Sequence, residues 1–245
     1  MFSKQNTEAL FLGEEEIGDA DKIFILFTKD FGKIEIFARG IRKINAKLKE
    51  NATLFLLGSV EFVQGKNQKI LTDSFPIDKF YGIRGDERKL KIALAFVNVL
   101  FSLIPFEEKD ENLWFLLNNF FKKLANIKIA FLLSLYYYYL WNLIAILGFK
   151  PVLEHCISCK IKPKKDDIFY FSVKEGGIIC KKCFRKNFLD EKDYVKPINF
   201  NTIKILKFFL HEDYKNLRIL KADFLNLKLI TKFYLDFLKN YQKYE

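Results

Sequence analysis

The stretch IFILFTKDFGKIEIFAR, residues 23–39, decides how the first third of the chain folds. Residues 23–27 form a short apolar run of β-branched and aromatic side chains, which is typical of a strand. A turn with Gly32 follows, and residues 33–39 then alternate with the two-residue period of a second strand. One face of this strand is predicted to carry Ile34, Ile36 and Ala38, and the other Lys33, Glu35, Phe37 and Arg39.

Further short strands are predicted around this hairpin. A basic loop that includes Arg42, Lys43 and Lys47 follows the second strand. Two more strands flank residues 64–67, which have the composition of a hairpin turn. About five short strands in residues 1–80 predict a small closed β-barrel, and the OB-fold is a common barrel of this size.

The apolar pattern then changes to the period of a helix. Apolar residues recur every three or four positions between Leu90 and Ile104, and Pro105 ends this run. Asp110 is placed to cap the next helix, and the same pattern returns in residues 227–241. We therefore predict an α+β protein in which an α-helical domain follows the barrel.

Residues 129–149 contain no charged side chain and are long enough to cross a bilayer. Four consecutive tyrosines, Tyr136 to Tyr139, lie near their centre, whereas tyrosines in membrane helices prefer the interfaces. A helix that is apolar on all sides belongs either in a membrane or in a protein core. We expect a buried core helix and no association with a membrane.

The four cysteines of the chain form two pairs, Cys156-x2-Cys159 and Cys180-x2-Cys183, with twenty residues between the pairs. This spacing predicts a zinc ribbon or knuckle, in which four thiolates surround one structural Zn²⁺. A closed shell leaves no position for water or substrate, so the ion would fold the chain and perform no chemistry. Two disulfides or two redox pairs are the alternatives. His155 is expected to be a bystander.

These patterns give a predicted domain organisation. Residues 1–80 are expected to form an OB-fold domain that binds nucleic acid. Residues 81–245 are expected to form the helical domain, with the zinc module embedded at about residues 150–186. Zinc thiolates and the absence of a signal peptide favour the reducing cytoplasm.

The positive charge of the chain is concentrated in two regions. The net charge is +11, and residues 36–70 carry seven basic against two acidic side chains. Residues 150–186 carry ten basic against four acidic side chains. This clustering favours a polyanionic partner, most simply nucleic acid. The alternatives are lysines that serve solubility, or a protein-interaction scaffold whose basic surface binds an acidic protein.

The sequence contains no catalytic signature. The phosphate-binding motifs G-x4-G-K-[ST] and G-x-G-x-x-G do not occur, nor do H-E-x-x-H and G-x-S-x-G. We therefore predict that the protein is not an enzyme.

Several short motifs resemble the bacterial DNA repair and recombination mediator family RecO. The N-terminal ones are Gly18-Asp19-Ala20-Asp21-Lys22-Ile23, Phe27-Thr28, Gly32-Lys33 and Ala38-Arg39-Gly40. The resemblance resumes at Gly148-Phe149-Lys150-Pro151-Val152-Leu153 and continues through Cys156-x2-Cys159 and Gly176-Gly177-x2-Cys180-x2-Cys183. Asp19 stands where Glu is commoner, and Glu14-Glu15-Glu16 makes the first turn unusually acidic.

The resemblance implies an N-terminal OB-fold, a helical domain and an embedded zinc finger. It also implies binding of single- and double-stranded DNA and annealing of complementary strands. The implied protein partners are RecR and the C-terminal tail of single-strand binding protein, with RecA loaded indirectly onto coated DNA. The implied location is the cytoplasm, in association with the nucleoid.

Candidate DNA-binding residues lie on the barrel. Lys33 and Arg39 flank Phe37 on one strand face, so two cations could track the phosphates while a base stacks on the ring. Phe37 packing beneath a loop is the alternative. Arg42, Lys43 and Lys47 extend this track or form a solvated loop. The zinc module either holds a second strand or is structural only.

Overall fold

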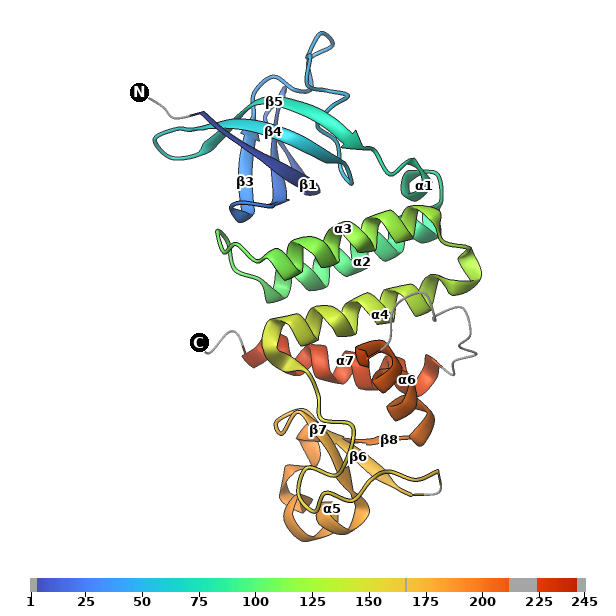
Figure 1. The fold of residues 1–245 in the computed structure, drawn as a ribbon. Coiled ribbons are helices and arrows are strands. Elements are labelled where there is room, and N and C mark those ends of the chain that lie inside the picture. Colours follow the sequence, from blue (N-terminus) through green and yellow to red (C-terminus); the bar gives the residue numbers. More distant parts are fainter. Residues whose placement is uncertain (1–3, 166, 212–223, 242–245) are drawn as a thin grey trace. The chain divides into compact units, whose positions relative to one another are not determined.

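The computed structural model describes residues 4–165, 167–211 and 224–241 (Figure 1). The chain divides into two compact units, Met1–Leu132 and Leu133–Glu245. In the described residues, the first unit contains a β-barrel followed by helices, and the second contains helices and a small three-stranded sheet.

The barrel closes in the order β1-β2-β3-β5-β4, which confirms the predicted five-stranded barrel and is compatible with an OB-fold. All neighbouring strands pair in antiparallel fashion except β3 and β5, which are parallel. The strands are β1 (Lys4–Ile17), β2 (Asp21–Thr28), β3 (Gly32–Ala38), β4 (Leu57–Gln64) and β5 (Lys69–Asp78).

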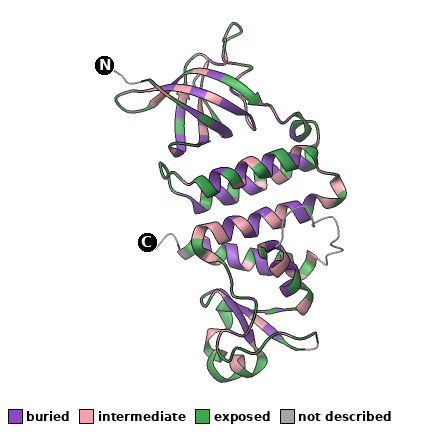
Figure 2. Ribbon diagram, in the orientation of Figure 1, coloured by how far each residue is buried: buried purple, intermediate pink, exposed green. Residues whose placement is uncertain are grey.

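The quoted hairpin supplies much of the barrel core. Phe24 pairs with Ile36 and Leu26 with Ile34, and all four side chains are fully buried. Buried residues recur along the strands of the barrel (Figure 2). The inward-facing residues of the other strands join them, including Phe11, Val60 and Phe62. Because side chains alternate along a strand, burying this set leaves Glu35 and Arg39 outside.

Three helices complete the first unit: α1 (Tyr81–Arg84), α2 (Glu87–Leu103) and α3 (Glu111–Asn126). Asp86 and Asp110 cap α2 and α3 by accepting hydrogen bonds from the Arg88 and Leu113 amides, at 2.9 and 3.0 Å. Aromatic rings of α3 contact rings of the barrel, as in the stacked pair of Trp114 and Phe27. Packing therefore groups these helices with the barrel, while a domain boundary at residue 80 remains a prediction.

The second unit is built around α4 (Leu132–Ile144), which a π-helical turn extends to Phe149. Trp141 of α4 is fully buried, and its indole N–H donates to the Thr231 hydroxyl at 3.0 Å. Residues 129–149 are long and apolar enough to cross a membrane, and half of that stretch is buried inside the protein. Two further α-helices of this unit are α6 (Phe200–His211) and α7 (Phe224–Tyr241).

The cysteine module is a three-stranded antiparallel sheet of order β7-β6-β8, with a short helix, α5 (Lys181–Asn187). Its strands are β6 (Phe169–Ser172), β7 (Gly177–Cys180) and β8 (Val195–Ile198). Strand β8 lies beyond residue 186, the end predicted for the module, so the sheet needs a segment that the cysteine spacing does not reveal.

Candidate functional site

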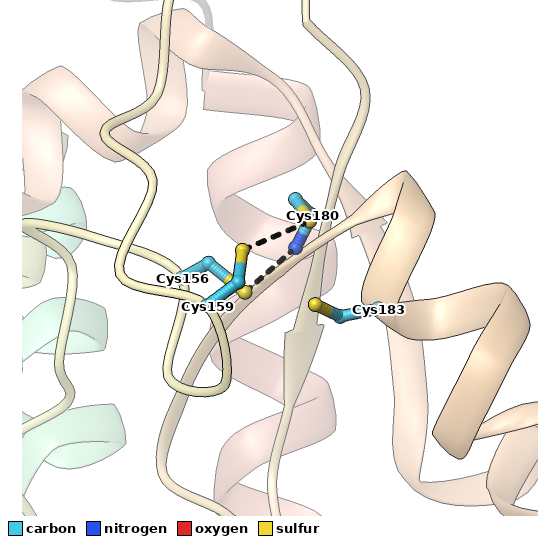
Figure 3. Close-up of side chains that lie close together, drawn as sticks. All are labelled: Cys156, Cys159, Cys180 and Cys183. Atoms are coloured by element: carbon cyan, nitrogen blue, oxygen red, sulfur yellow. Dashed lines mark hydrogen bonds between the residues drawn. The ribbon is translucent and has the colours of Figure 1, made fainter.

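The four cysteines meet at one point. Their sulfur atoms all lie within 4.8 Å of one another, and Figure 3 shows them converging from two chain segments. The Cys159 and Cys180 sulfurs are 3.6 Å apart, and all four cysteines are free. A single cluster of four is what a metal site requires, whereas two disulfides would divide the sulfurs into bonded pairs.

Two local turns bring the pairs together. The Lys160 amide donates to the Cys156 carbonyl at 2.9 Å, which closes the first turn, and Lys160 has a left-handed φ of 61°. Gly176 has a φ of 60° in the turn that precedes β7 and Cys180. A Cβ on Gly177 would lie 2.8 Å from the Val152 carbonyl oxygen, so only glycine lets these segments approach.

The electrostatics of the cluster favour a bound cation. Burial raises the pKa of the Cys156 thiol, but hydrogen bonds from backbone amides of Cys159, Cys180 and Ser158 outweigh it and lower that pKa to about 7. Burial, together with the three neighbouring cysteines, raises the pKa of Cys183 to about 12. Four thiolates this close repel one another, and a divalent cation among them would favour the ionised form of each.

The geometry also fits a metal ion. Tetrahedral zinc with Zn–S distances of about 2.3 Å separates its sulfurs by about 3.8 Å. The observed spacing, with one pair at 3.6 Å and all pairs within 4.8 Å, accommodates such an ion. His155 stays outside the cluster, and its Nδ1 lies 3.3 Å from the Cys156 carbonyl oxygen. The four cysteines could therefore hold one metal ion.

The second candidate site is a hollow on the barrel. Arg39, Lys43 and Lys47 line this hollow, whose volume is about 650 Å³. All three side chains are exposed, and in the described part of the chain none of them forms an ion pair. Asp21 also lines the hollow, where its carboxylate accepts a 2.7 Å hydrogen bond from the Gly40 amide. No sequence pattern predicts this contact, because an acidic residue at the start of a strand has many roles.

The loop that carries Lys43 and Lys47 is ordered by its own backbone. The Ala46 amide donates to the Lys43 carbonyl at 3.1 Å, and the Ala52 amide to the Leu48 carbonyl at 2.9 Å. Ile44 is 94% exposed, the most exposed of the large apolar side chains in the described residues. An exposed apolar side chain between cations is a feature that the apolar pattern of the sequence does not distinguish from a core residue.

Phe37 lies half-buried on β3. Its backbone neighbours across the sheet are Ile23 on β2 and Ile70 on β5, which are also half-buried. These three residues form an apolar row on the outer side of the barrel, and Arg39 directly follows the last residue of β3. The structure thus leaves part of the Phe37 ring open to a ligand.

Arg42 is held by the turn between β1 and β2. Its guanidinium donates to the Gly18 carbonyl oxygen at 3.0 Å and pairs with Glu16 at 3.1 Å. Lys22 similarly pairs with Glu14 at 3.0 Å. The acidic residues Glu14 and Glu16, which the structure places in β1 and not in a turn, are therefore paired with basic residues, and Arg42 is less available to a ligand than Arg39.

Lys33 does not occupy the exposed position predicted for it. The side chain is 5% exposed, and its ammonium donates to the Ile104 carbonyl oxygen at 2.6 Å. The ammonium also lies 4.1 Å from the centre of the Phe106 ring. Burial lowers the pKa of Lys33. The segment that covers Lys33 lies some 70 residues away in the sequence, so strand alternation alone could not predict it.

Comparison with known proteins identifies the family. The family model described as recombination protein O, N terminal, matches residues 1–80, and the C-terminal model matches residues 84–241. The DNA repair protein RecO of Thermoanaerobacter sp. (strain X514) is 28% identical over 239 residues, covering 98% of this chain and 93% of the relative.

Two further relatives carry the same name. The DNA repair protein RecO of Dehalococcoides mccartyi (strain ATCC BAA-2266 / KCTC 15142 / 195) is 30% identical over 217 residues, 89% of this chain and 82% of the relative. That of Bacillus subtilis (strain 168) is 28% identical over 219 residues, 86% of this chain and 78% of the relative. The resemblance seen in the short motifs is thus confirmed across nearly the whole chain, which belongs to the RecO family of DNA repair proteins that act in recombination.

Proposed function

We propose that this chain is a non-catalytic recombination mediator that binds single- and double-stranded DNA and anneals complementary strands. We further propose that it works with RecR and with the C-terminal tail of single-strand binding protein, so that RecA is loaded onto coated DNA. This work takes place in the cytoplasm, in association with the nucleoid. The single observation that carries the DNA-binding role is the barrel hollow with its three unpaired cations, Arg39, Lys43 and Lys47.

The hollow suits a phosphate backbone. Three cations on one surface neutralise successive phosphates, and counterion release then supplies much of the affinity. The half-open Phe37 ring, two residues before Arg39 on β3, offers a face on which a base can stack. OB-folds bind oligonucleotides on the face formed by their second and third strands, which here are β2 and β3.

Among the residues predicted from the sequence, the supported set is therefore Phe37, Arg39, Lys43 and Lys47. Arg42 contributes mainly by neutralising Glu16, and Lys33 contributes to the packing of the barrel. Ile44 joins the set as an apolar contact at the surface of the loop.

The metal of the cysteine cluster is proposed to be one structural Zn²⁺. Its four ligands, Cys156, Cys159, Cys180 and Cys183, leave no open coordination position, and thiolate ligands in a tetrahedral arrangement select zinc among the common divalent ions. The ion then stabilises the module and takes no part in the handling of DNA bases.

A salt titration tests the barrel site. The triple variant R39A/K43A/K47A should shallow the slope of log affinity for an oligodeoxythymidine against log salt by roughly 2, since each lost phosphate contact on a single strand removes about 0.7. A control triple, K122A/K128A/K228A, removes the same charge from exposed positions outside the hollow. Equal slopes for the two triples would show that the hollow does not bind DNA.

The alternative function is a zinc-containing scaffold that uses a basic surface to bind an acidic protein. The clustered charge of the chain favours any polyanion, so this alternative needs its own measurement. Polyglutamate should compete poorly with the oligonucleotide at equal charge concentration if DNA is the ligand. A strand-annealing assay with and without single-strand binding protein then tests the mediator role.

A further inference from the structure

The cysteine module carries a second group of basic side chains, which we call the module cations. All of them are exposed. In residues 4–165, 167–211 and 224–241, none of them forms an ion pair. They are Lys160, Lys162, Lys164, Lys165, Lys181, Lys182, Arg185 and Lys186.

The fold brings these cations around the cysteine cluster. Lys160 directly follows Cys159, and Lys181 and Lys182 lie between Cys180 and Cys183, whose sulfurs converge within 4.8 Å. The loop of residues 161–168, which lies between the two cysteine pairs in the sequence, is also anchored at both ends.

Backbone hydrogen bonds fix these two ends near the cluster. The Cys156 amide donates to the Ile161 carbonyl at 2.8 Å, and the Lys181 amide donates to the Ile168 carbonyl at 3.1 Å. The loop that carries Lys162, Lys164 and Lys165 therefore starts and ends beside the cysteines, and its charges belong to the same small module.

Local charge balance does not account for this number of cations. Four thiolates with one divalent ion carry a net charge of −2, which about two lysines would neutralise. Lys160 also occupies a left-handed conformation, with φ 61°, in which glycine would be less strained. The chain thus keeps a lysine where the turn itself favours glycine.

Apolar side chains lie among the cations. Ile161 is 50% exposed and Ile168 is 49% exposed, one at each anchored end of the loop. Cations interspersed with exposed apolar groups are the mixture that single-stranded nucleic acids require, because phosphates contact the cations while bases and sugars contact the apolar groups.

We propose that the module cations form a second polynucleotide site, which holds one strand while the barrel hollow holds another. This inference rests on the proposed function, because annealing requires two strands to be held by one protein. It deepens that function by assigning the second strand to the cysteine module. The ligand is a single-stranded nucleic acid bound through its phosphates.

The test counts strands on the full chain. Two non-complementary oligodeoxynucleotides with different fluorescent labels are mixed with the protein, and energy transfer between them reports a complex that holds both. The variant K164E/K165E reverses two charges on the loop, away from the metal ligands. The control K228E/K232E reverses two exposed charges on α7 in the same compact unit. Metal content and circular dichroism confirm that each variant is folded.

The expected result is that the parent chain and K228E/K232E hold both strands, and that K164E/K165E loses second-strand affinity roughly tenfold or more. A separate variant, K160G, should keep the metal and raise the melting temperature while weakening the second strand. The proposal would be overturned if K164E/K165E held both strands as tightly as the parent chain does. It would also be overturned if K228E/K232E lost second-strand affinity as much as K164E/K165E does.

Two further outcomes distinguish this proposal from the proposed barrel site and from binding of an acidic protein. If R39A/K43A/K47A still holds two strands while K164E/K165E holds one, the barrel site fails and the module site stands. The parent chain could instead hold only one strand and bind polyglutamate, with K164E/K165E losing the polyglutamate binding. This result would show that the module cations bind an acidic protein and not a polynucleotide.

Discussion

The Lys33 ammonium donates a 2.6 Å hydrogen bond to the carbonyl oxygen of Ile104, 71 residues further along the chain. The Glu107 amide returns a 2.9 Å hydrogen bond to the Lys33 carbonyl oxygen. These two bonds tie β3 of the barrel to the loop between α2 and α3. A lysine that the sequence pattern assigns to the surface is thus a connection within the first compact unit.

Replacing Lys33 by methionine should destabilise the first unit without weakening DNA binding. Methionine keeps an unbranched apolar side chain at this buried position. It loses the ammonium that lies over the Phe106 ring and leaves the Ile104 carbonyl without its donor, and the lost donor alone costs about 1–3 kcal/mol. Chemical denaturation measures this loss. The exposed control, Lys47→Met, should show the reverse: unchanged stability and weaker oligonucleotide binding. Weaker binding by K33M at unchanged stability would contradict this assignment.

Gly32 should tolerate no side chain. A Cβ there would lie 2.0 Å from the Glu108 carbonyl oxygen, and the residue has a φ of 65°. Gly32→Ala combines left-handed strain of about 1–2 kcal/mol with a steric clash of about 1–3 kcal/mol. Gly18 has a φ of 53° with nothing within 4 Å of its Cβ position, so Gly18→Ala carries the strain alone.

The two alanine variants therefore form a matched pair. Denaturant unfolding of G32A should show a larger loss of stability than that of G18A, and the difference measures the packing of the loop at Glu108 on the hairpin. Equal losses would mean that this loop moves away at little cost.

The barrel was predictable because its information is local. Residues 23–39 contain two strands and their turn in one stretch, and the alternation of residues 33–39 correctly assigns Ile34, Ile36 and Ala38 to the core. The predicted cap at Asp110 is likewise local, since its side chain bonds the amide of Leu113, three residues away. Short-range patterns of this kind predict the same strand or helix in any fold that buries the same face of the element.

The candidate sites were predictable only where residue spacing itself determines the geometry. The two C-x2-C pairs predict the sulfur cluster, because each turn directs two sulfurs to one side. The residues that bury Lys33, Ile104 and Phe106, lie about 70 positions further along the chain. The third strand of the module, β8, likewise lies outside the segment that the cysteine spacing defines, so no local sequence pattern predicts either feature. The exposure of Ile44 is equally invisible, because an isoleucine in a sequence is most often a core residue.

Removing one cysteine should unfold the module locally. Cys159→Ser replaces one of four sulfurs that lie within 4.8 Å of one another, so metal affinity should fall sharply and bound metal should drop below one ion per chain. Elemental analysis gives the identity and the amount of the metal. Hydrogen exchange should show loss of protection in β6 and β7, while the barrel strands keep theirs.

The neighbouring substitution Ser158→Ala is the control for this variant. Ser158 is exposed and lies between the two cysteines of the first pair, but it contributes no side-chain ligand. It should retain metal and protection like the parent. Full metal retention by C159S would mean that the cluster does not coordinate the ion through all four sulfurs.

The second unit should lose stability at alkaline pH because of Tyr234. Burial raises the pKa of this phenol from 10.0 to about 12, and its hydroxyl donates to the Phe149 carbonyl at 2.9 Å. In the unfolded chain the phenol ionises near pH 10, so between pH 10 and 12 the unfolded state releases its proton first. The free energy of unfolding therefore falls as pH rises through this window, by at most about 1.4 kcal/mol for each pH unit.

Tyr234→Phe isolates this contribution. Near pH 8 the variant should be less stable than the parent by about 1 kcal/mol, because the Phe149 carbonyl loses its donor. As pH rises above 10 the parent loses stability and the variant lacks this loss, so the difference should shrink and then reverse. Denaturation followed by circular dichroism measures both proteins across the range. Tyr136→Phe should likewise remove part of the loss of stability above pH 10, since burial also raises the pKa of Tyr136 to about 12. A stability difference between the parent and Tyr234→Phe that stays constant with pH would contradict the assignment.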